Sequence, residues 1–344
     1  MRRAAATLQD VARAAGVSLS TASNALTGRG RVAEATRRRV VETAERLAFR
    51  PNTLARSFVT GRSFVVGILA EQAPGTFSMP VLIGAHGALG RHDMASLSYD
   101  AHGDPALRQE YLDRLRTRRV DGLLVVGQGP DAPSPAIGAD FAAPVVHAYA
   151  RPEDPTATAY GPDNVAAGRL AAEHLLGLGR SRLAVVTAAA SLTAVHDRLT
   201  GVRSVLDAAD LRMVGEPLHG AWRRAWGAEA TDRLLAAGRP FDAVIAGNDE
   251  IAGGVRARLE DAGLRVPDDV AIVGVDNFNG FTRIEDRSLT TIDLNLPEVG
   301  AAAAAHVLRA IDGSAEPGRY TVAPSLVPGR STLGEVVADA PPLD

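Results

Sequence analysis

The residues TLQDVARAAGVSLSTASNAL, numbers 7–26, decide the fold of the amino-terminal end of the chain. Thr7 is placed to cap a helix, and apolar side chains recur at helical spacing through residues 8–15. Gly16 is expected to end this helix, because glycine adopts the left-handed backbone of a helix end without steric cost. Ser18 is placed to cap a second helix that follows at once. Two short helices joined by a turn that contains glycine predict a helix-turn-helix.

A third helix is expected from about Ala33 to Ala48. The residues expected to face inward from it are Val40, Val41, Ala44 and Leu47. The second helix of a helix-turn-helix enters the major groove of DNA, where small polar side chains near its start suit contact with bases. The segment from Leu19 to Asn24 supplies such side chains. Pattern alone leaves an ordinary three-helix fragment as the alternative interpretation.

Charge is distributed unevenly along the 344 residues. Residues 1–62 contain twelve arginines and four acidic residues, a balance of +8, whereas the rest of the chain has a balance of −11. This contrast favours a polyanionic partner for the first 62 residues, although a solvated helical face is the alternative. The chain contains no cysteine, so disulfides, thiolate metal sites and cysteine nucleophiles are excluded. It also contains no lysine, so all its basic residues other than histidine are arginines.

Three motifs at the amino-terminal end resemble those of one family of regulators. Residues 7–23 resemble T-[IL]-x-D-V-A-x-x-A-G-V-S-x-x-T-V-S, the headpiece motif of the lactose/galactose repressor family. Residues 32–40, VAEATRRRV, are similar to V-S-x-x-T-R-x-x-V, and residues 49–58, FRPNTLARSF, to Y-x-P-N-x-x-A-R-S-L. The resemblance implies a DNA-binding headpiece over residues 1–50 and a hinge helix with a linker over residues 51–62.

The resemblance also implies which headpiece residues contact double-stranded operator DNA. Leu19, Ser20 and Asn24 match positions that read base edges, while hydroxyl side chains and Arg31 match positions near phosphates. The implied set is Thr7, Leu8, Ser18, Leu19, Ser20, Thr21, Ser23, Asn24, Thr27, Arg31 and Thr36. Asn24 stands where Arg or His is frequent, and its amide favours adenine on geometric grounds. Ala33 stands where a serine would cap the third helix.

Residues 52–58 resemble the family's hinge helix, which binds in the minor groove. The residues that the resemblance assigns to DNA are Asn52, Ala55, Arg56 and Phe58. Phe58 replaces the usual leucine, and it is expected to wedge between base pairs and kink the duplex. A seven-residue helix is unstable alone, so this one is expected to form only on DNA. A linker residue packed on the body is the alternative for Phe58.

From Ser63 onward, short apolar runs alternate with amphipathic stretches, which predicts βαβ units and parallel sheets. The expected strands are 64–69, 95–99, 122–126, 144–147, 182–186, 243–246 and 270–273. The expected helices are 81–91, 105–116, 165–178, 198–209, 225–237, 250–262 and 297–312. The predicted fold class is therefore α/β, with an all-α helix-turn-helix headpiece and a core built on parallel sheets.

The body resembles the two-lobed, periplasmic-binding-protein-like core of the same family, on motifs such as Asp163-Asn164, Asn248-Asp249 and Gly274-Val275-Asp276. The resemblance implies an amino-terminal lobe of residues 63–162 with 292–322. It implies a carboxy-terminal lobe of residues 163–291 with 323–337, and residues 338–344 are expected to be a disordered tail. Ligands of open α/β sheets bind at the carboxyl ends of strands, so an effector is expected between the lobes.

Family positions that hold an effector match polar and aromatic residues of the body. Arg198, in R-x-x-G, and the residues Asn248 and Asp276 match positions that hold sugar hydroxyls, and Trp222 matches a residue that stacks on the ligand. The expected set is Glu71, Phe77, Tyr149, Arg198, Trp222, Asn248 and Asp276. Tyr149 stands where sugar-binding relatives carry an acid. The alternatives are a helix cap for Asp276, a surface ion pair for Arg198 and a core position for Trp222.

The sequence is accordingly interpreted as a homodimeric transcriptional repressor controlled by a small-molecule effector, with a carbohydrate as the first expectation. A nucleobase-responsive member of the family and a ligand-binding module without a DNA role are the alternatives. No nucleophile with a base, metal-binding histidine motif or phosphate loop is visible, so neither catalysis nor a cofactor is expected. The absence of a secretory signal or long apolar segment predicts a cytoplasmic protein without membrane contact. The sequence leaves open whether the effector releases DNA or promotes its binding.

Overall fold

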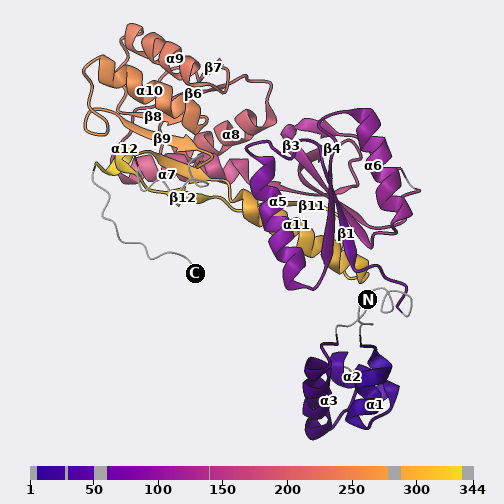
Figure 1. Cartoon of the computed structure of the whole chain (residues 1–344). Helices are drawn as coiled ribbons and strands as arrows, with labels where there is room; N and C mark the ends of the chain where they lie inside the picture. The colour runs from indigo at the N-terminus through magenta and orange to yellow at the C-terminus, as the bar shows by residue number, and fades with distance from the viewer. Residues whose placement is uncertain (1–5, 28–29, 50–59, 139, 278–287, 335–344) are drawn as a thin grey trace. The chain divides into compact units, whose positions relative to one another are not determined.

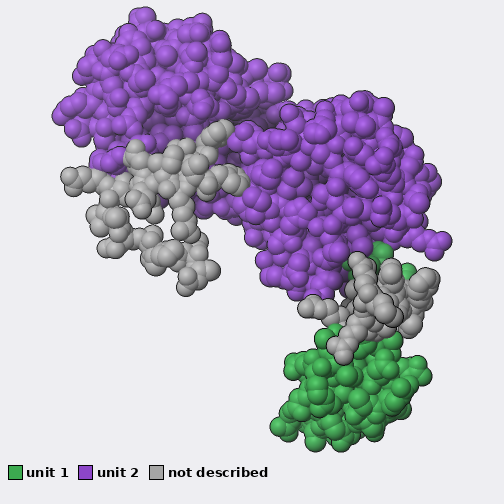
Figure 2. Space-filling view, viewed as in Figure 1, with its two compact units in different colours: residues 1–64 green, residues 65–344 purple. Residues whose placement is uncertain are grey.

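The computed structural model describes residues 6–27, 30–49, 60–138, 140–277 and 288–334. Contacts divide the chain into two compact units, residues 1–64 and residues 65–344 (Figure 2). The hinge residues expected to contact DNA lie outside the described residues, and so does the tail 338–344. Those hinge residues are Asn52, Ala55, Arg56 and Phe58.

The first unit contains the helices α1 (Leu8–Ala15), α2 (Leu19–Thr27) and α3 (Glu34–Arg46) (Figure 1). The Thr7 hydroxyl accepts a hydrogen bond from the Asp10 amide at 3.3 Å, and the Asp10 carboxylate accepts one from the Thr7 amide at 3.0 Å. This reciprocal capping box satisfies two backbone donors at the start of α1. Gly16 ends α1 in the left-handed conformation, with φ of 63°. The caps predicted for α1 are confirmed.

The three helices enclose a core of small apolar side chains. Its buried members are Val11, Ala12, Ala15, Ala22, Ala25, Val40 and Ala44. The prediction that Val41 faces inward is wrong, because its side chain is 36% exposed. Residues of a helix are about 100° apart, which puts Val41 beyond the edge of the face that Val40, Thr43 and Ala44 bury. The Arg37 guanidinium donates to the carbonyl of Ala25 at 3.1 Å and thereby joins α3 to the end of α2.

Replacing Ala33 with serine is expected to stabilise the headpiece. Ala33 occupies the N-cap of α3 and supplies no side-chain hydrogen bond. A serine hydroxyl there would accept from a first-turn amide, which contributes about 1 kcal/mol. Thermal unfolding followed by circular dichroism should show a headpiece transition about 4–8 °C higher. Ala35→Ser, one residue inside the same helix, is the matched control; equal melting temperatures for the two variants would contradict the assignment of the cap.

The amino-terminal lobe of the second unit is a sheet with strand order β11-β5-β4-β3-β1-β2, paired in parallel throughout its described residues. Its strands are β1 (Val65–Ala70), β2 (Ala95–Asp100), β3 (Gly122–Ser134), β4 (Val145–Pro152), β5 (Thr158–Pro162) and β11 (Arg319–Val322). Its helices are α5 (Ser78–Arg91), α6 (Pro105–Thr117) and α11 (Leu296–Ile311). Apolar side chains of α6 pack against β1 and β3, and α5 pairs with α11.

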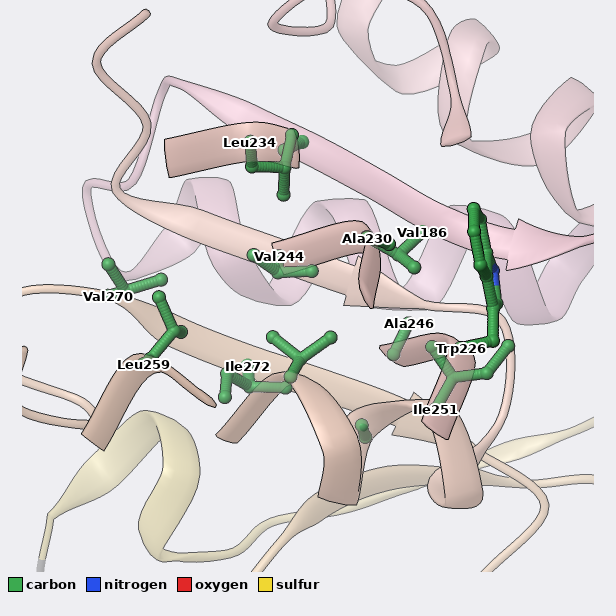
Figure 3. Close-up of a cluster of buried hydrophobic side chains, with 13 residues drawn as sticks. Val186, Trp226, Ala230, Leu234, Val244, Ala246, Ile251, Leu259, Val270 and Ile272 are labelled. Carbon is green, nitrogen blue, oxygen red and sulfur yellow. The ribbon is translucent and has the colours of Figure 1, made fainter. Parts of the chain in front are cut away.

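The carboxy-terminal lobe repeats this plan with the order β12-β10-β9-β8-β6-β7, in which only β12 is antiparallel among the described strands. Its strands are β6 (Leu183–Ala188), β7 (Leu218–Gly220), β8 (Ala243–Ala246), β9 (Ala271–Val275), β10 (Thr290–Asp293) and β12 (Ser325–Val327). Its helices are α7 (Asn164–Gly177), α8 (Thr193–Ala208), α9 (Arg224–Ala236), α10 (Asp249–Asp261) and α12 (Arg330–Leu333). Figure 3 shows side chains of α9 and α10 packed on β6, β8 and β9.

Within the described residues, the chain passes between the two lobes at three places. It leaves β5 for α7 at residue 163, leaves β10 for α11 at residues 294–295, and leaves β11 for β12 at residues 323–324. Ile292 and Asp293 were expected in the amino-terminal lobe, but they belong to β10 of the carboxy-terminal sheet. The strand pairs with β9 as far as Ile292, so the crossing comes after Asp293 rather than before Ile292.

Paired helices approach one another at glycine. A Cβ atom on either glycine of such a pair would collide with backbone atoms of the opposite helix. The pairs are Gly84 and Gly300 in α5 and α11, Gly168 and Gly201 in α7 and α8, and Gly227 and Gly254 in α9 and α10. Close packing of α7 on α8 therefore fixes the position of the residues that α8 presents to the interlobe region. No helix within the described ranges is long and apolar enough to cross a membrane.

Candidate functional site

Arg198 lies in the second turn of α8, because this helix begins at Thr193 and not at Arg198 as the sequence predicted. Its side chain is only 12% exposed. Nε donates to Oδ1 of Asn164 at 2.9 Å, and Nη1 donates to the carbonyl oxygen of Gly247. Nη2 lies 3.5 Å from Oδ1 of Asp276. The guanidinium therefore joins the start of α7, the end of β8 and the end of β9. The alternative of a surface ion pair for Arg198 is wrong, because its contact with Asp276 is buried.

Asp276 follows β9 with a φ of 108°, and its side chain is 7% exposed. Burial raises the pKa of this carboxyl group to about 7, and the charges of Asp249 and Asp293 add to the increase while Arg198 opposes it. A carboxyl group with this pKa near neutral pH can accept a hydrogen bond as carboxylate or donate one as acid. Strongly shifted pKa values in a buried polar cluster are typical of functional sites.

A polar network lies beside Asp276. The hydroxyl of Thr291 donates to Asp249 at 2.6 Å and accepts from the backbone amide of Asn277 at 3.2 Å. The Asn277 side chain donates to Asp293 at 2.8 Å. Asn277 and Asn164 were not predicted as site residues from the sequence, although Asp163-Asn164 was one of the motifs that resemble the family. These bonds hold the segment after β9 in place.

Replacing Asp276 with asparagine is expected to change how stability depends on pH. The folded carboxyl group keeps its proton up to about pH 7, whereas an ordinary aspartate loses it near 3.8. The folded chain thus binds more protons than the unfolded chain between these values, so raising the pH from 4 to 7 removes stability. Asparagine does not titrate. The melting temperature of Asp276→Asn relative to the parent protein should therefore rise across this range and level off above it.

Differential scanning calorimetry at half-unit steps of pH measures this effect, with Asp261→Asn on the exposed side of α10 as the matched control. The control should track the parent protein at every pH. A constant difference between Asp276→Asn and the parent from pH 4 to 7 would show that Asp276 titrates normally.

Arg198 contacts both Trp222 and Gly247, the residue that precedes Asn248. The Trp222 side chain is 37% exposed, and Cζ of Arg198 lies 5.7 Å from its ring centroid. The buried tryptophan of this lobe is Trp226, whose indole N–H donates to the carbonyl of Thr187, so the core alternative for Trp222 is wrong. The Asn248 oxygen caps α10 by accepting from the amide of Ile251 at 2.9 Å. Asn248 can therefore offer a ligand its amide donors.

Three expected pocket residues come from the amino-terminal lobe. Tyr149 lies inside β4, which continues beyond the predicted end, and its ring centroid is 6.2 Å from that of Phe77. Burial raises the pKa of Tyr149, and the charges of Asp276 and Arg198 reach this hydroxyl across the lobes. Tyr149 is thus near the buried pair of the other lobe.

Glu71 serves a different contact. Its carboxylate accepts from Nε of Arg108 at 3.0 Å, and Arg108 also donates to the carbonyl of Pro135 at 2.7 Å. Both side chains line a cavity of about 220 Å³ within the amino-terminal lobe, together with Gln128 and Ser134. Described residues of the carboxy-terminal lobe do not line this cavity. The structure therefore places Glu71 apart from Arg198 and Asp276.

The start of α2 presents the headpiece residues that were expected to read bases. Leu19 is 52% exposed, and Ser20 and Asn24 are exposed beside it. The Ser18 hydroxyl lies within hydrogen-bond distance of the hydroxyls of Ser20 and Thr21, at 2.9 and 2.8 Å, and accepts from the Thr21 amide at 3.1 Å. Hydroxyl groups therefore gather at this end of the helix.

The remaining expected DNA contacts differ in exposure. Arg31 and Thr7 are exposed, whereas the side chains of Thr21, Ser23 and Thr36 are half-buried. Leu8 packs against the headpiece core, which gives this side chain a structural role. Thr27 is the last residue of α2.

Comparison with known proteins adds to this geometry. Residues 7–52 match the family described as bacterial regulatory proteins of the lacI family. Residues 63–329 match the family described as periplasmic binding proteins and sugar binding domain of the LacI family. The chain belongs to the LacI family. It is therefore a DNA-binding transcriptional regulator with an effector-binding core.

Individual relatives match this LacI-family regulator over most of its length. The ribose operon repressor of Escherichia coli strain K12 is 30% identical over 300 residues, which cover 87% of this chain and 91% of that repressor. A crystal structure of the lac repressor dimer bound to operator and an anti-inducer has a TM-score of 0.64 at 22% identity, and covers 96% and 99% of the two chains. A complex of the regulator CelR with cellobiose has a TM-score of 0.60 at 25% identity, and covers 95% and 99%.

Proposed function

We propose that this LacI-family regulator is a repressor that binds operator DNA as a homodimer and responds to a neutral carbohydrate. In this proposal the carbohydrate is held by Arg198 and Asp276, with Trp222 stacked on one face. The observation that carries the proposal is the buried contact of Arg198 with Asp276 beside an exposed indole ring.

The chemistry of the pair favours a ligand with many hydroxyl groups. A guanidinium supplies several directed donors, and a carboxyl group supplies acceptors, which together match the donor and acceptor of each hydroxyl. Their formal charges cancel when Asp276 is ionised, so a neutral ligand leaves no buried charge unpaired. An indole face beside them can cover the apolar C–H face of a sugar ring.

Two properties of relatives support the carbohydrate class. The CelR structure is a complex with cellobiose, and the relative from E. coli is named for the ribose operon. The contact at Tyr149 is expected to differ from that in sugar-binding relatives, because they carry an acid at this position. The aromatic rings of Tyr149 and Trp222 also keep a nucleobase as the second candidate, since such rings can stack on a planar base.

A thermal-shift screen distinguishes the two ligand classes. Pentoses, hexoses, disaccharides and purine and pyrimidine bases are each added at millimolar concentration to the full chain. A ligand that binds only the native state adds about 2.7 kcal/mol of stability at a hundred times its Kd. We expect a neutral carbohydrate to raise the melting temperature and to change the affinity for DNA. A shift with a nucleobase and none with any carbohydrate would overturn the carbohydrate assignment.

The start of α2 supports the DNA-binding part of the proposal. Ser20 and Asn24 present hydrogen-bonding groups to bases, and Leu19 presents an apolar surface that suits a thymine methyl group. Arg31 and the nearby hydroxyl groups are expected to contact phosphates and so to set the register on the duplex. The homodimer would place two headpieces on a palindromic operator.

A further inference from the structure

The second half of β3 forms an arm that carries Asp131. The strand pairs regularly with β4 up to Val126, and its register then shifts between Val126 and Gly129 and again between Gly129 and Pro133. The arm, defined here as residues 127–134, still belongs to the amino-terminal lobe. Asp131 near its centre is half-buried.

The Asp131 carboxylate reaches a helix of the other lobe. Its Oδ1 accepts a hydrogen bond of 2.6 Å from the backbone amide of Thr193, the first residue of α8. The N-cap residue of α8 is Leu192, and it supplies no side-chain hydrogen bond. Amides in the first turn of a helix have no partner within the helix, and the helix end is partly positive, so a carboxylate is well placed there. Asp131 thus takes the role that a capping side chain of α8 itself would normally have.

The same contact is opposed by repulsion. Burial raises the pKa of Asp197 on α8, and the negative charges of Asp131 and Asp163 raise it further. Asp131 is therefore close enough to Asp197 for the two carboxylates to repel one another, while the helix end attracts Asp131.

We propose that Asp131 is a positioning residue for the effector response, a latch that joins the β3 arm of one lobe to the start of α8 in the other. Arg198 lies five residues after Thr193 on the same helix, so the latch sets where the guanidinium lies relative to Tyr149. A ligand that contacts Arg198 and Tyr149 together favours the latched form. By reciprocity, the latch raises the affinity for that ligand by the same factor. This role rests on the proposed function, whereas the latch itself does not.

Two substitutions remove the two halves of the hydrogen bond separately. Asp131→Ala removes the acceptor. Thr193→Pro removes the amide donor, and proline is well tolerated at the first position of a helix. Leu192 has φ of −82° and ψ of 132°, the conformation that a residue before proline prefers. Asp131→Asn is the conservative variant, because an asparagine oxygen caps helices as well as aspartate does. Glu153→Ala, an exposed carboxylate of the same lobe, is the matched control.

The distance between the lobes is the direct measurement, and it needs neither DNA nor effector. The chain has no cysteine, so cysteines introduced at Gln109 of α6 and Ala236 of α9 carry the only spin labels. Because the proposed homodimer would carry four labels, the labelled full chain is mixed with an excess of unlabelled chain, so that the distance within one chain is measured. Double electron–electron resonance should then give one narrow distance distribution for the parent, Asp131→Asn and Glu153→Ala. Asp131→Ala and Thr193→Pro should each broaden it, and the double variant should do so no further.

Hydrogen exchange gives a second measurement on the unlabelled chain. The first-turn amides of α8 should exchange about five to ten times faster in Asp131→Ala, the change expected for a lost helix cap. The latch is overturned if Asp131→Ala leaves both the distance distribution and the exchange unchanged, or if the effects of the two single substitutions add. A broadened distribution together with an unchanged carbohydrate response would instead confirm the latch and contradict its link to the effector.

Discussion

Replacing Arg198 with alanine is expected to abolish the effector response and to leave operator binding intact. The guanidinium bonds Asn164 and Gly247 and contacts Asp276, so its loss removes the donors proposed for the ligand. DNA affinity measured by fluorescence anisotropy should be the same with and without the carbohydrate found by the thermal-shift screen. In the parent protein the same titration should show a change of about 5–150-fold.

The controls for Arg198→Ala separate stability from response. Removing one partner of a buried ion pair destabilises a protein by about 3–5 kcal/mol, and protonation of Asp276 should reduce that cost here. The double variant Arg198→Ala/Asp276→Asn is expected to recover stability but not the response. Arg203→Ala, an exposed arginine on the same helix, should respond like the parent. A normal response from Arg198→Ala would remove this residue from the effector site.

Replacing Ser20 with glutamate is expected to weaken operator binding by at least about a hundredfold. Ser20 is exposed in the first turn of α2, among the residues proposed to enter the major groove. A carboxylate there would enter the major groove between two phosphate backbones, and like charges placed together at an interface cost several kcal/mol. The substitution should not unfold the headpiece, because an acidic side chain is favourable in the first turn of a helix. The loss of affinity should therefore occur without a lower melting temperature.

Val41→Glu is the matched control for this prediction. Val41 is exposed on α3 next to Glu42, so a further carboxylate on that surface adds the same charge away from the proposed DNA contact. Operator affinity should fall by much less than for Ser20→Glu. Equal losses for the two variants would mean that net charge, and not the start of α2, determines binding.

The headpiece could be predicted closely because its signals are local. A capping threonine, a left-handed glycine and apolar residues at helical spacing are readable within one or two turns, and α1 begins and ends where they indicate. The body was predicted less completely. The strands β5, β7, β10, β11 and β12 were not expected, since they have three to five residues and include Gly and Pro in β5. Such strands are specified by their neighbours in the sheet.

The candidate site shows the same division between local and tertiary signals. Arg198 and Asp276 were selected from motifs, but their mutual contact depends on how α8 packs on α7 through Gly168 and Gly201. The Glu71 contact with Arg108 joins residues 37 positions apart, and nothing near Glu71 in the sequence indicates it. Asp131 was not selected at all. The third strand was expected to end at Val126, whereas it continues through a segment with Gly and Pro to Ser134.

Salt dependence of DNA binding tests the central claim most directly. The full chain first selects a binding site from a random duplex library. Its affinity for that duplex is then measured at salt concentrations from about 50 to 200 mM, a range over which counterion release changes affinity strongly. The logarithm of the association constant should fall linearly with the logarithm of the salt concentration, with a slope of about −0.9 for each phosphate contacted. Adding the carbohydrate should change the association constant at each salt concentration. Failure to select or bind any duplex at low salt, with or without ligand, would contradict the claim that this chain is a ligand-controlled DNA-binding protein.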